Sequence, residues 1–287
     1  MTGELSSLSD LLLALLLGLV QGLTEFLPIS SSAHLYAIPY LFSIDHALLS
    51  SRAFAAVVHL GTLAAVLVVL RRDVVRLIAA ALRPIVSLGR RRGDAADERL
   101  LLAVLVGTVP AVLFGIFAGD LLDSGVRTPL VVAAAVLIGA ALLWIAERAS
   151  SLQRPLSGIS AIDGALIGVA QALALIPGIS RSGATISGGL LLGFSRDAAA
   201  RISFIMGIPA IAGAGLLELR GLLSDGFDVQ SAAPLLLVGL IGAFSSGLVA
   251  IGLLMRLLKG GKLWTFALYR VMFALALILT ALVRGEF

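Results

Sequence analysis

The sequence predicts an all-α polytopic membrane protein, built as an inverted-topology repeat with six spanning helices and two re-entrant half-helix pairs. Three observations lead to this prediction. Apolar stretches of membrane-spanning length recur along the chain, basic residues gather in alternate connections, and one short helix-breaking motif occurs twice.

The composition excludes an ordinary soluble domain. Of the 287 residues, 59% are hydrophobic and 13% are charged, whereas a soluble domain carries about a quarter charged residues. Residues 1–10 lack the positive charge of a signal peptide, so the first apolar run is expected to stay in the protein. The absence of cysteine excludes disulfides and cysteine nucleophiles. The basic residues lie between apolar runs, which favours topology determinants over nucleic-acid binding.

Six segments are long and apolar enough to cross a hydrocarbon core, which requires roughly 20 residues. The predicted spans are 51–70, 100–118, 129–147, 200–220, 234–256 and 265–283.

Four further apolar segments form two interrupted pairs. The first pair, 9–27 and 33–43, is broken by LPISSSAH at 27–34, and the second, 161–176 and 183–194, is broken by IPGISRSG at 176–183. Proline removes a helix donor and clashes with the preceding turn. Each pair is therefore expected to be two half-helices joined by a bent loop.

The distribution of basic residues predicts the orientation of the chain. Segment 71–99 contains eight arginines, and a cytoplasmic position for this loop places 15 of the 21 Lys and Arg residues inside. Such a bias is typical of a multi-pass protein of the plasma membrane. Both interrupted pairs return to the side from which they start. If both are re-entrant, they enter from opposite faces and their turns meet near the midplane, where non-helical backbone must be protein-buried or line a wet cavity.

The two breaks belong to an internal repeat. Residues 18–32 align without gaps on 168–182, with six of fifteen positions identical. Three spanning segments follow each copy, so the second copy is inverted relative to the first, and such repeats place a site at their interface. We therefore expect one integral membrane domain, 1–287, with repeat one at about 9–147 and repeat two at about 159–283.

The two copies differ in their polar residues. The first copy has Glu25, Ser31 and His34, and these positions align with Leu175, Arg181 and Ala184 in the second. A charged side chain at the centre of a membrane helix costs about 2.5–3.5 kcal/mol on insertion scales, so such residues usually mark a functional site. Together, these side chains offer a base or metal ligand, a nucleophile or acid, and a group that binds phosphate.

Several other residues fit an anion site. Hydroxyls at a helix start together with free N–H groups bind anions, and arginine offers a fork for two phosphate oxygens. Gln21 lies one helical turn before Glu25 and supports that carboxylate or a metal. Arg270 is either an interface residue or a second phosphate contact, and His59 is interpreted as a packed or satisfied residue. The hydroxyls at the two breaks are Ser30, Ser31, Ser32, Ser180, Ser182 and Thr185.

Two sequence motifs resemble the signatures of a known enzyme family. QGLTEFLPISSSAH at 21–34 and PGISRSGATISGG at 177–189 closely resemble those of the undecaprenyl-pyrophosphate phosphatase (BacA/UppP) family, and the resemblance extends to FALYR at 266–270. It implies an integral membrane enzyme that hydrolyses a polyprenyl diphosphate to the monophosphate and phosphate. That reaction recycles the lipid carrier for peptidoglycan and other surface polymers, and overproduction confers bacitracin resistance.

The resemblance also implies roles for individual residues. Glu25 matches the second acid of the family's (E/Q)xxxE motif, with Gln21 at the first position, and Ser31 and His34 match the proposed nucleophile and acid/base. The matches to the phosphate-binding motif are Ser180, Arg181, Ser182 and Thr185. Because position 21 is glutamine rather than glutamate, this sequence lacks the second carboxylate that a two-carboxylate metal site needs.

The expected mechanism is phosphoryl transfer, with Ser31 or a water molecule as the attacking group. Arg181 neutralises the phosphates, and a divalent cation, Mg²⁺ or Ca²⁺, is expected on Glu25 and phosphate oxygens. The alternative is a lipid-phosphate transporter or flippase that uses the same inverted-repeat site. The sequence leaves open whether two copies form a homodimer.

Overall fold

The computed structural model describes residues 7–86, 94–123, 128–224, 229–261 and 263–286, and no strand forms within those ranges. The helices are α1 (Leu8–Phe26), α2 (Ser31–Phe42), α3 (Arg52–Val69), α4 (Arg71–Val86), α5 (Ala95–Asp123), α6 (Pro129–Ala149), the 3₁₀ helix η1 (Leu156–Gly158), α7 (Ala161–Leu173), α8 (Arg181–Leu191), α9 (Arg196–Ser224), α10 (Val229–Lys259) and α11 (Trp264–Arg284). The all-α prediction is confirmed.

Six described helices are long and apolar enough to cross a bilayer, namely α1, α5, α6, α9, α10 and α11. Five of these correspond to predicted spans. The sixth predicted span, 51–70, is α3, which meets the criteria only together with α4, after a bend of 84°. Helix α1, predicted as half of a re-entrant pair, is by itself 19 residues long. The protein is thus a multi-pass membrane protein, and the re-entrant path of α1 and α2 stays a prediction.

The arginine-rich segment 71–99 was expected to be a loop, and this expectation is wrong for most of its described part. Residues Arg71–Val86 form α4, and α5 begins at Ala95. The charges suggested a loop, but the apolar residues between them recur at helical spacing and form one face. Val74 and Leu77 on that face pack against the main hydrophobic core.

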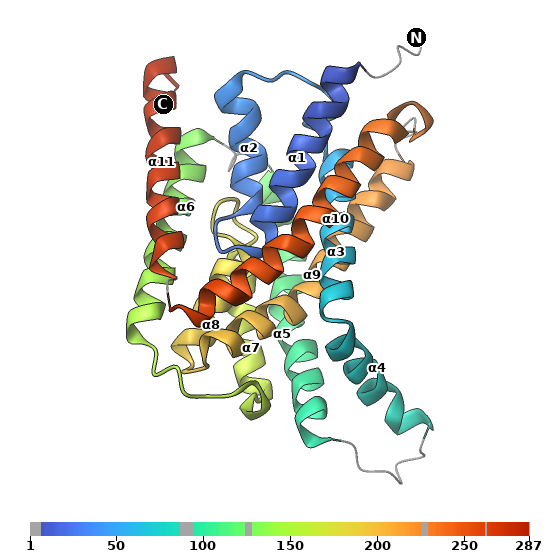
Figure 1. Ribbon diagram of the computed structural model, residues 1–287, viewed down its shortest axis with the longest axis vertical. Coiled ribbons are helices and arrows are strands. Elements are labelled where there is room, and N and C mark those ends of the chain that lie inside the picture. The colour runs from blue at the N-terminus through green and yellow to red at the C-terminus, as the bar shows by residue number, and fades with distance from the viewer. Residues whose placement is uncertain (1–6, 87–93, 124–127, 225–228, 262, 287) are drawn as a thin grey trace.

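Both predicted helix breaks are present, and the two interrupted pairs lie on opposite sides of them. The first break separates α1 from α2, and the second separates α7 from α8. In Figure 1, α1 and α2 lie above the breaks, whereas α7 and α8 lie below them. This arrangement is consistent with the inverted repeat predicted from the sequence. Ser160 and Asp163 form a capping box at the start of α7.

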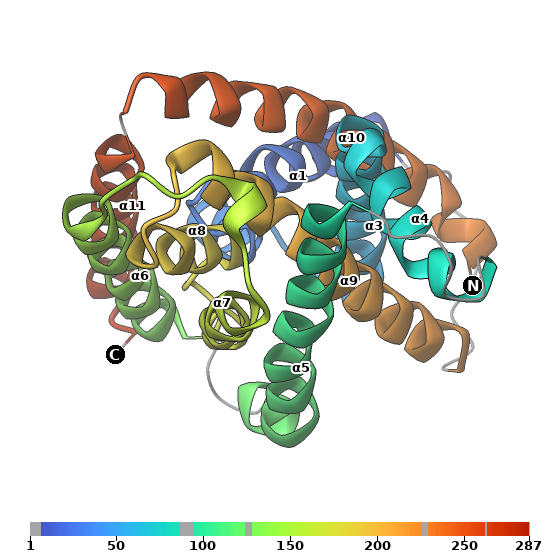
Figure 2. The ribbon, with the colours of Figure 1, turned by 90° about the horizontal axis from the view of Figure 1, so that it is seen from below.

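Helix contacts follow the same two-fold pattern. Helix α1 packs against α10 as its counterpart α7 packs against α5, and α6 pairs with its own counterpart α11. The α6–α11 pair stands at one side of the molecule in both Figure 1 and Figure 2. The equivalent glycines Gly18 and Gly168 lie at the close contacts. A Cβ atom on either would come within 2.2 Å of a backbone carbonyl oxygen, that of Gly239 or Gly107 respectively.

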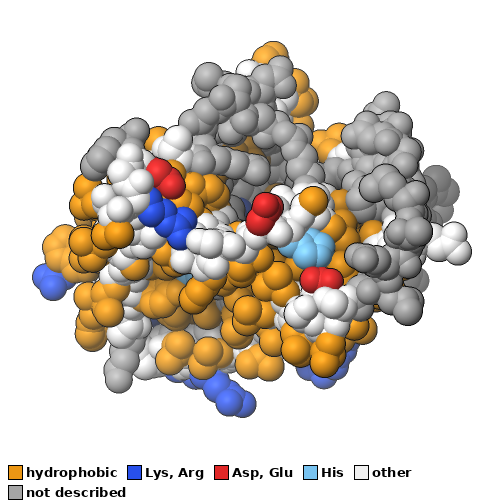
Figure 3. Space-filling model, turned by 90° about the horizontal axis from the view of Figure 1, so that it is seen from above, with side chains coloured by type: hydrophobic (Ala, Val, Ile, Leu, Met, Phe, Trp, Pro, Cys, Tyr) orange, Lys and Arg blue, Asp and Glu red, His pale blue; other side chains and the backbone are white. Residues whose placement is uncertain are grey.

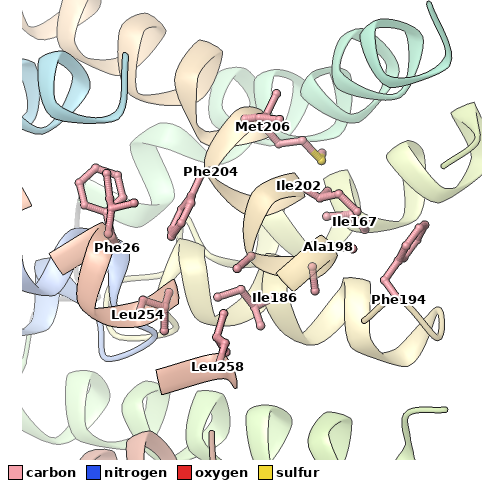
Figure 4. Close-up of a cluster of buried hydrophobic side chains, with 14 of the residues drawn as sticks. Phe26, Ile167, Ile186, Phe194, Ala198, Ile202, Phe204, Met206, Leu254 and Leu258 are labelled. Atoms are coloured by element: carbon pink, nitrogen blue, oxygen red, sulfur yellow. The ribbon is translucent and has the colours of Figure 1, made fainter. Parts of the chain in front are cut away.

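The largest hydrophobic core lies beside the breaks. It draws residues from α1, α7, α8, α9 and α10, as Figure 4 shows. Phe26, the residue after Glu25, meets Phe204 of α9 edge to face, with ring centroids 5.6 Å apart. Aromatic pairs of this kind contribute about 0.5–1.5 kcal/mol beyond their buried area. The core therefore holds the end of α1 firmly against the second repeat.

We predict that Gly168→Ala destabilises the protein by about 1–3 kcal/mol, because the added methyl group forces α7 away from α5. The measurement is the thermal unfolding of purified protein in detergent. Gly252→Ala in α10 is the matched control, since a Cβ atom there meets nothing within 4 Å. Equal unfolding temperatures for the two variants would contradict the close contact.

Candidate active site

Two serines with the same unusual backbone begin the half-helices at the breaks. Ser30 has φ 75° and precedes α2, and Ser180 has φ 75° and precedes α8. Positive φ is uncommon for a residue with a side chain, and such strain gathers at functional sites. Each serine Oγ caps its helix by accepting a hydrogen bond, from the N–H of Ala33 or of Gly183. The next residue in each copy, Ser31 or Arg181, is the first of its helix.

Hydrogen bonds join the two breaks directly. Ser182 Oγ donates to the carbonyl oxygen of Leu27 at 2.9 Å, and the N–H of Gly178 donates to Ser32 Oγ at 3.4 Å. The breaks also lie side by side near the middle of the molecule in Figure 1. The N-terminal ends of α2 and α8 therefore meet, as the repeat predicted.

Arg270 of α11 ties both breaks together. Its side chain is completely buried, and Nη1 donates to Pro28 in the first break at 3.3 Å. Nη2 donates to Gly178 and Ile179 in the second break, each at 2.9 Å, and Nε donates to Val136 of α6 at 3.1 Å. In this arrangement its donors bind backbone carbonyls. The predicted phosphate contact of Arg270 stays a prediction.

The reactive groups converge on the carboxylate of Glu25, which is 7% exposed. Its Oε1 accepts a hydrogen bond from Arg181 Nη2 at 2.8 Å. Its Oε2 accepts from Ser31 Oγ at 2.6 Å and from Gln21 Nε2 at 3.0 Å. Four residues singled out from the sequence are thus in direct contact, and the hydroxyl of Ser31 points its proton at a base.

Arg181 is held in place by α8 and α9. Its carbonyl oxygen accepts a hydrogen bond from Thr185 Oγ1 at 2.8 Å, and the same hydroxyl contacts Ser203 Oγ at 2.7 Å. Gly207 of α9 leaves the space for the guanidinium, since a Cβ atom there would lie 1.4 Å from Nη1. The sequence analysis did not identify Gly207, because only the packing of α9 on α8 reveals its role.

His34 does not contact the Glu25 carboxylate. Its Nδ1 is 2.7 Å from the carbonyl oxygen of Ser30, and its Nε2 is 2.7 Å from the hydroxyl of Tyr269. The ring also stacks on Phe273 at 4.2 Å between centroids. Both nitrogens are occupied, so the predicted acid/base role of His34 stays a prediction.

His59 lies at the site instead. Its Nε2 is 3.8 Å from Glu25 Oε2, and its Nδ1 is 2.7 Å from the carbonyl oxygen of Ala55. The sequence-based interpretation of His59 as a packed or satisfied residue is therefore incomplete. Its spacing along α3 gives no signal of this neighbour, because the contact depends on how α3 packs against α1.

The residues around Glu25 are compatible with a divalent cation. The described residues contain no group of three or more His, Cys, Asp or Glu side chains that could hold a metal. However, Gln21 is completely buried and its Oε1 has no hydrogen-bond partner. An unpaired buried oxygen calls for a water or an ion, and amide and carboxylate oxygens suit Mg²⁺ and Ca²⁺. Gln21 and Glu25 could thus hold such an ion, with water and ligand oxygens completing its shell.

A cavity of about 440 Å³ adjoins the breaks between α2 and α3. Its walls include Ser32 and Pro177 from the two breaks and His59 from α3. Many of its lining residues belong to α2, the helix that lies above the breaks in Figure 1. The upper face carries scattered charged side chains among hydrophobic and uncharged ones (Figure 3).

These features define an integral membrane protein in which two opposed half-helix ends bring a serine hydroxyl and a guanidinium onto one buried carboxylate. The comparison with protein families agrees with this class. The model of the family described as bacitracin resistance protein BacA matches residues 14–276. The chain belongs to this family.

Curated relatives match over nearly the whole chain. Proteins named undecaprenyl-diphosphatase from Myxococcus xanthus and Thermomicrobium roseum are each 44% identical, covering 96% and 93% of this chain and 90% and 96% of their own length. One of the same name from Methanosphaera stadtmanae is 37% identical and covers 96% of this chain and 99% of its own.

We predict that Arg270→Lys destabilises the protein by at least about 1–3 kcal/mol, because one ammonium group cannot serve carbonyls in both breaks and buried acceptors are left unpaired. Arg256→Lys, an exposed position on α10, is the control and is expected to change stability by less than about 0.5 kcal/mol. Thermal unfolding in detergent distinguishes them. A wild-type unfolding temperature for Arg270→Lys would mean that the guanidinium does not hold the breaks.

Proposed function

We propose that this protein is an undecaprenyl-diphosphate phosphatase that converts the polyprenyl diphosphate to the monophosphate and inorganic phosphate. This activity would recycle the lipid carrier for cell-envelope polymers and confer bacitracin resistance. The observation that carries the proposal is the contact of Ser31, Glu25 and Arg181 at 2.6 and 2.8 Å. The names of the relatives support the same reaction.

The diphosphate would bind at the N-terminal ends of α2 and α8, where free N–H groups and the helix dipoles attract anions. Arg181 would move from Glu25 to the phosphate oxygens, because its fork suits two oxygens at once. This exchange leaves the Glu25 carboxylate free to accept a proton. The isoprenoid tail would stay among the lipid-facing helices.

Ser31 Oγ would attack the terminal phosphorus in line with the bridging oxygen. Its proton passes to Glu25, the bond to the bridging oxygen breaks, and Glu25 gives the proton to the departing lipid monophosphate, which restores the carboxylate. Water then cleaves the phosphoserine, with Glu25 again as the base, and releases inorganic phosphate. Positioning and charge neutralisation by Arg181 and the helix ends supply most of the rate.

Gln21 and Glu25 are the residues that would hold a divalent cation, Mg²⁺ or Ca²⁺. Such an ion, when bound, supplies positive charge beside the diphosphate. The orphaned oxygen of Gln21 supports this assignment.

The protein would lie in the plasma membrane with segment 71–99 in the cytoplasm, an orientation that its eight arginines support. Helix α4 lies at the lower end of the molecule in Figure 1, and the cavity between α2 and α3 lies above the breaks. The diphosphate would then reach the site from the outer side of the membrane.

We expect purified protein in detergent to release phosphate from undecaprenyl diphosphate without any membrane gradient, which a transporter would not do. Ser31→Ala removes the attacking oxygen and is expected to abolish release, and EDTA is expected to suppress it. Phosphate release is measured colorimetrically, with a melting curve to verify folding. Undiminished release by Ser31→Ala would assign the attack to water.

We expect Arg181→Ala to abolish release and Arg181→Lys to lower it by about 10²–10³-fold, because the second variant keeps a charge beside Glu25 but loses the fork. Arg154→Lys is the matched control, since Arg154 forms an ion pair of similar length with Asp163 at 2.7 Å. Near-normal phosphate release by the folded Arg181 variants would contradict the proposed binding of the phosphates by Arg181.

Gly207→Ala tests the placement of Arg181 without changing a charged residue. The new methyl group would displace the flexible end of Arg181, so release is expected to fall at least about tenfold while the unfolding temperature stays near that of the wild type. Gly213→Ala, on the same helix and with nothing within 4 Å of its Cβ position, is expected to retain activity. Equal activity of the two variants would show that this space is not needed.

A further inference from the structure

We propose that His59 is a ligand of the divalent cation at Glu25, so that the ion is held by a carboxylate oxygen, an amide oxygen and an imidazole nitrogen. This inference rests on the cation of the proposed function and adds a residue that neither the sequence motifs nor the names of the relatives assign. It also gives the site a nitrogen donor, which changes the ions that it prefers.

The first argument is the orientation of the His59 ring. A backbone carbonyl only accepts hydrogen bonds, so the 2.7 Å contact with Ala55 makes Nδ1 the donor. In the neutral ring Nε2 then carries a lone pair, as it does in metal-binding histidines whose other nitrogen donates to a carbonyl. This lone pair and Glu25 Oε2, two electron-rich atoms, lie 3.8 Å apart.

The second argument is the distance between His59 Nε2 and Glu25 Oε2. At 3.8 Å the two atoms are too far apart for a hydrogen bond. Two ligands that each bind one cation at about 2.1 Å are separated by up to about 4.2 Å. The gap between His59 and Glu25 therefore fits a shared ion.

The third argument is the unpaired amide oxygen of Gln21. Its nitrogen donates to the same Oε2 of Glu25 that lies 3.8 Å from His59 Nε2, so the amide nitrogen lies beside this gap. Its Oε1 is buried without a partner, although buried polar atoms normally have one. An ion beside Glu25 would supply the missing partner.

Of the three proposed ligands, His59 is the one that lines the cavity. The His59 side chain is 29% exposed and forms part of the cavity wall, whereas Gln21 is completely buried. Water and phosphate oxygens can therefore complete the shell from that side. Carboxylate and amide oxygens suit Mg²⁺, Ca²⁺ and Mn²⁺, while imidazole suits transition metals. The mixed set favours Mn²⁺ over Ca²⁺.

The test uses Mn²⁺ alone as the probe on the purified full-length protein. Pulsed electron paramagnetic resonance of the bound ion detects a directly coordinated nitrogen. We expect this nitrogen coupling in the wild type and its loss in His59→Ala and in His59→Gln, a variant of similar size. Mn²⁺ affinity should fall at least about tenfold in both, while Mg²⁺ affinity falls less. Melting curves verify that the variants are folded.

His46→Ala is the matched control, because His46 is a partly buried histidine that also lies near a carboxylate, with 3.6 Å between its Nε2 and Asp10 Oδ1. It should retain the nitrogen coupling and the wild-type affinity for Mn²⁺. Absence of nitrogen coupling in the wild type, or its persistence in folded His59→Ala, overturns the proposal.

The phosphate-release assay separates this proposal from the proposed function. Phosphate release by a wild type without nitrogen coupling would leave the phosphatase in place and remove only the His59 ligand. Nitrogen coupling without any hydrolysis of the lipid diphosphate would leave the cation site and remove the phosphatase.

Discussion

The structure depends on the buried guanidinium of Arg270, which donates to carbonyls in both helix breaks and to Val136 of α6. A helix break exposes backbone groups that no water can satisfy inside a bilayer. Arginine can satisfy several of them from one point because its donors are fixed in a planar fork. The same bonds set the spacing between the ends of α2 and α8, and therefore between Ser31 and Arg181.

The two repeats share a backbone and divide the chemistry. Ser30 and Ser180 adopt the same φ and cap their half-helices in the same way. The residue that follows differs: Ser31 begins α2, and Arg181 begins α8. Duplication explains the scaffold, since each copy presents an anion-binding helix end to the other. Divergence at one position per copy then places the Ser31 hydroxyl and the Arg181 guanidinium on the same carboxylate.

The Glu25 carboxylate links the two repeats through charge and hydrogen bonds. The carboxylate bridges Ser31 and Arg181, so a charge that is expensive within a membrane protein is neutralised and hydrogen-bonded. Its neighbour Phe26 is anchored in the core shared with α9. The polar contact and the apolar contact are adjacent in the chain, so the packing of Phe26 helps to fix the position of the Glu25 carboxylate.

The sequence by itself determined the helical class, the two breaks, the repeat and the set of Gln21, Glu25, Ser31 and Arg181. These follow from local properties: apolar length, proline and glycine positions, and the cost of polar groups in an apolar segment. Only the tertiary structure decided the carbonyl partners of Arg270 and the place of His59 beside Glu25. Each of these depends on packing between segments far apart in the chain, and residue spacing carries no information about which face of α3 meets α1.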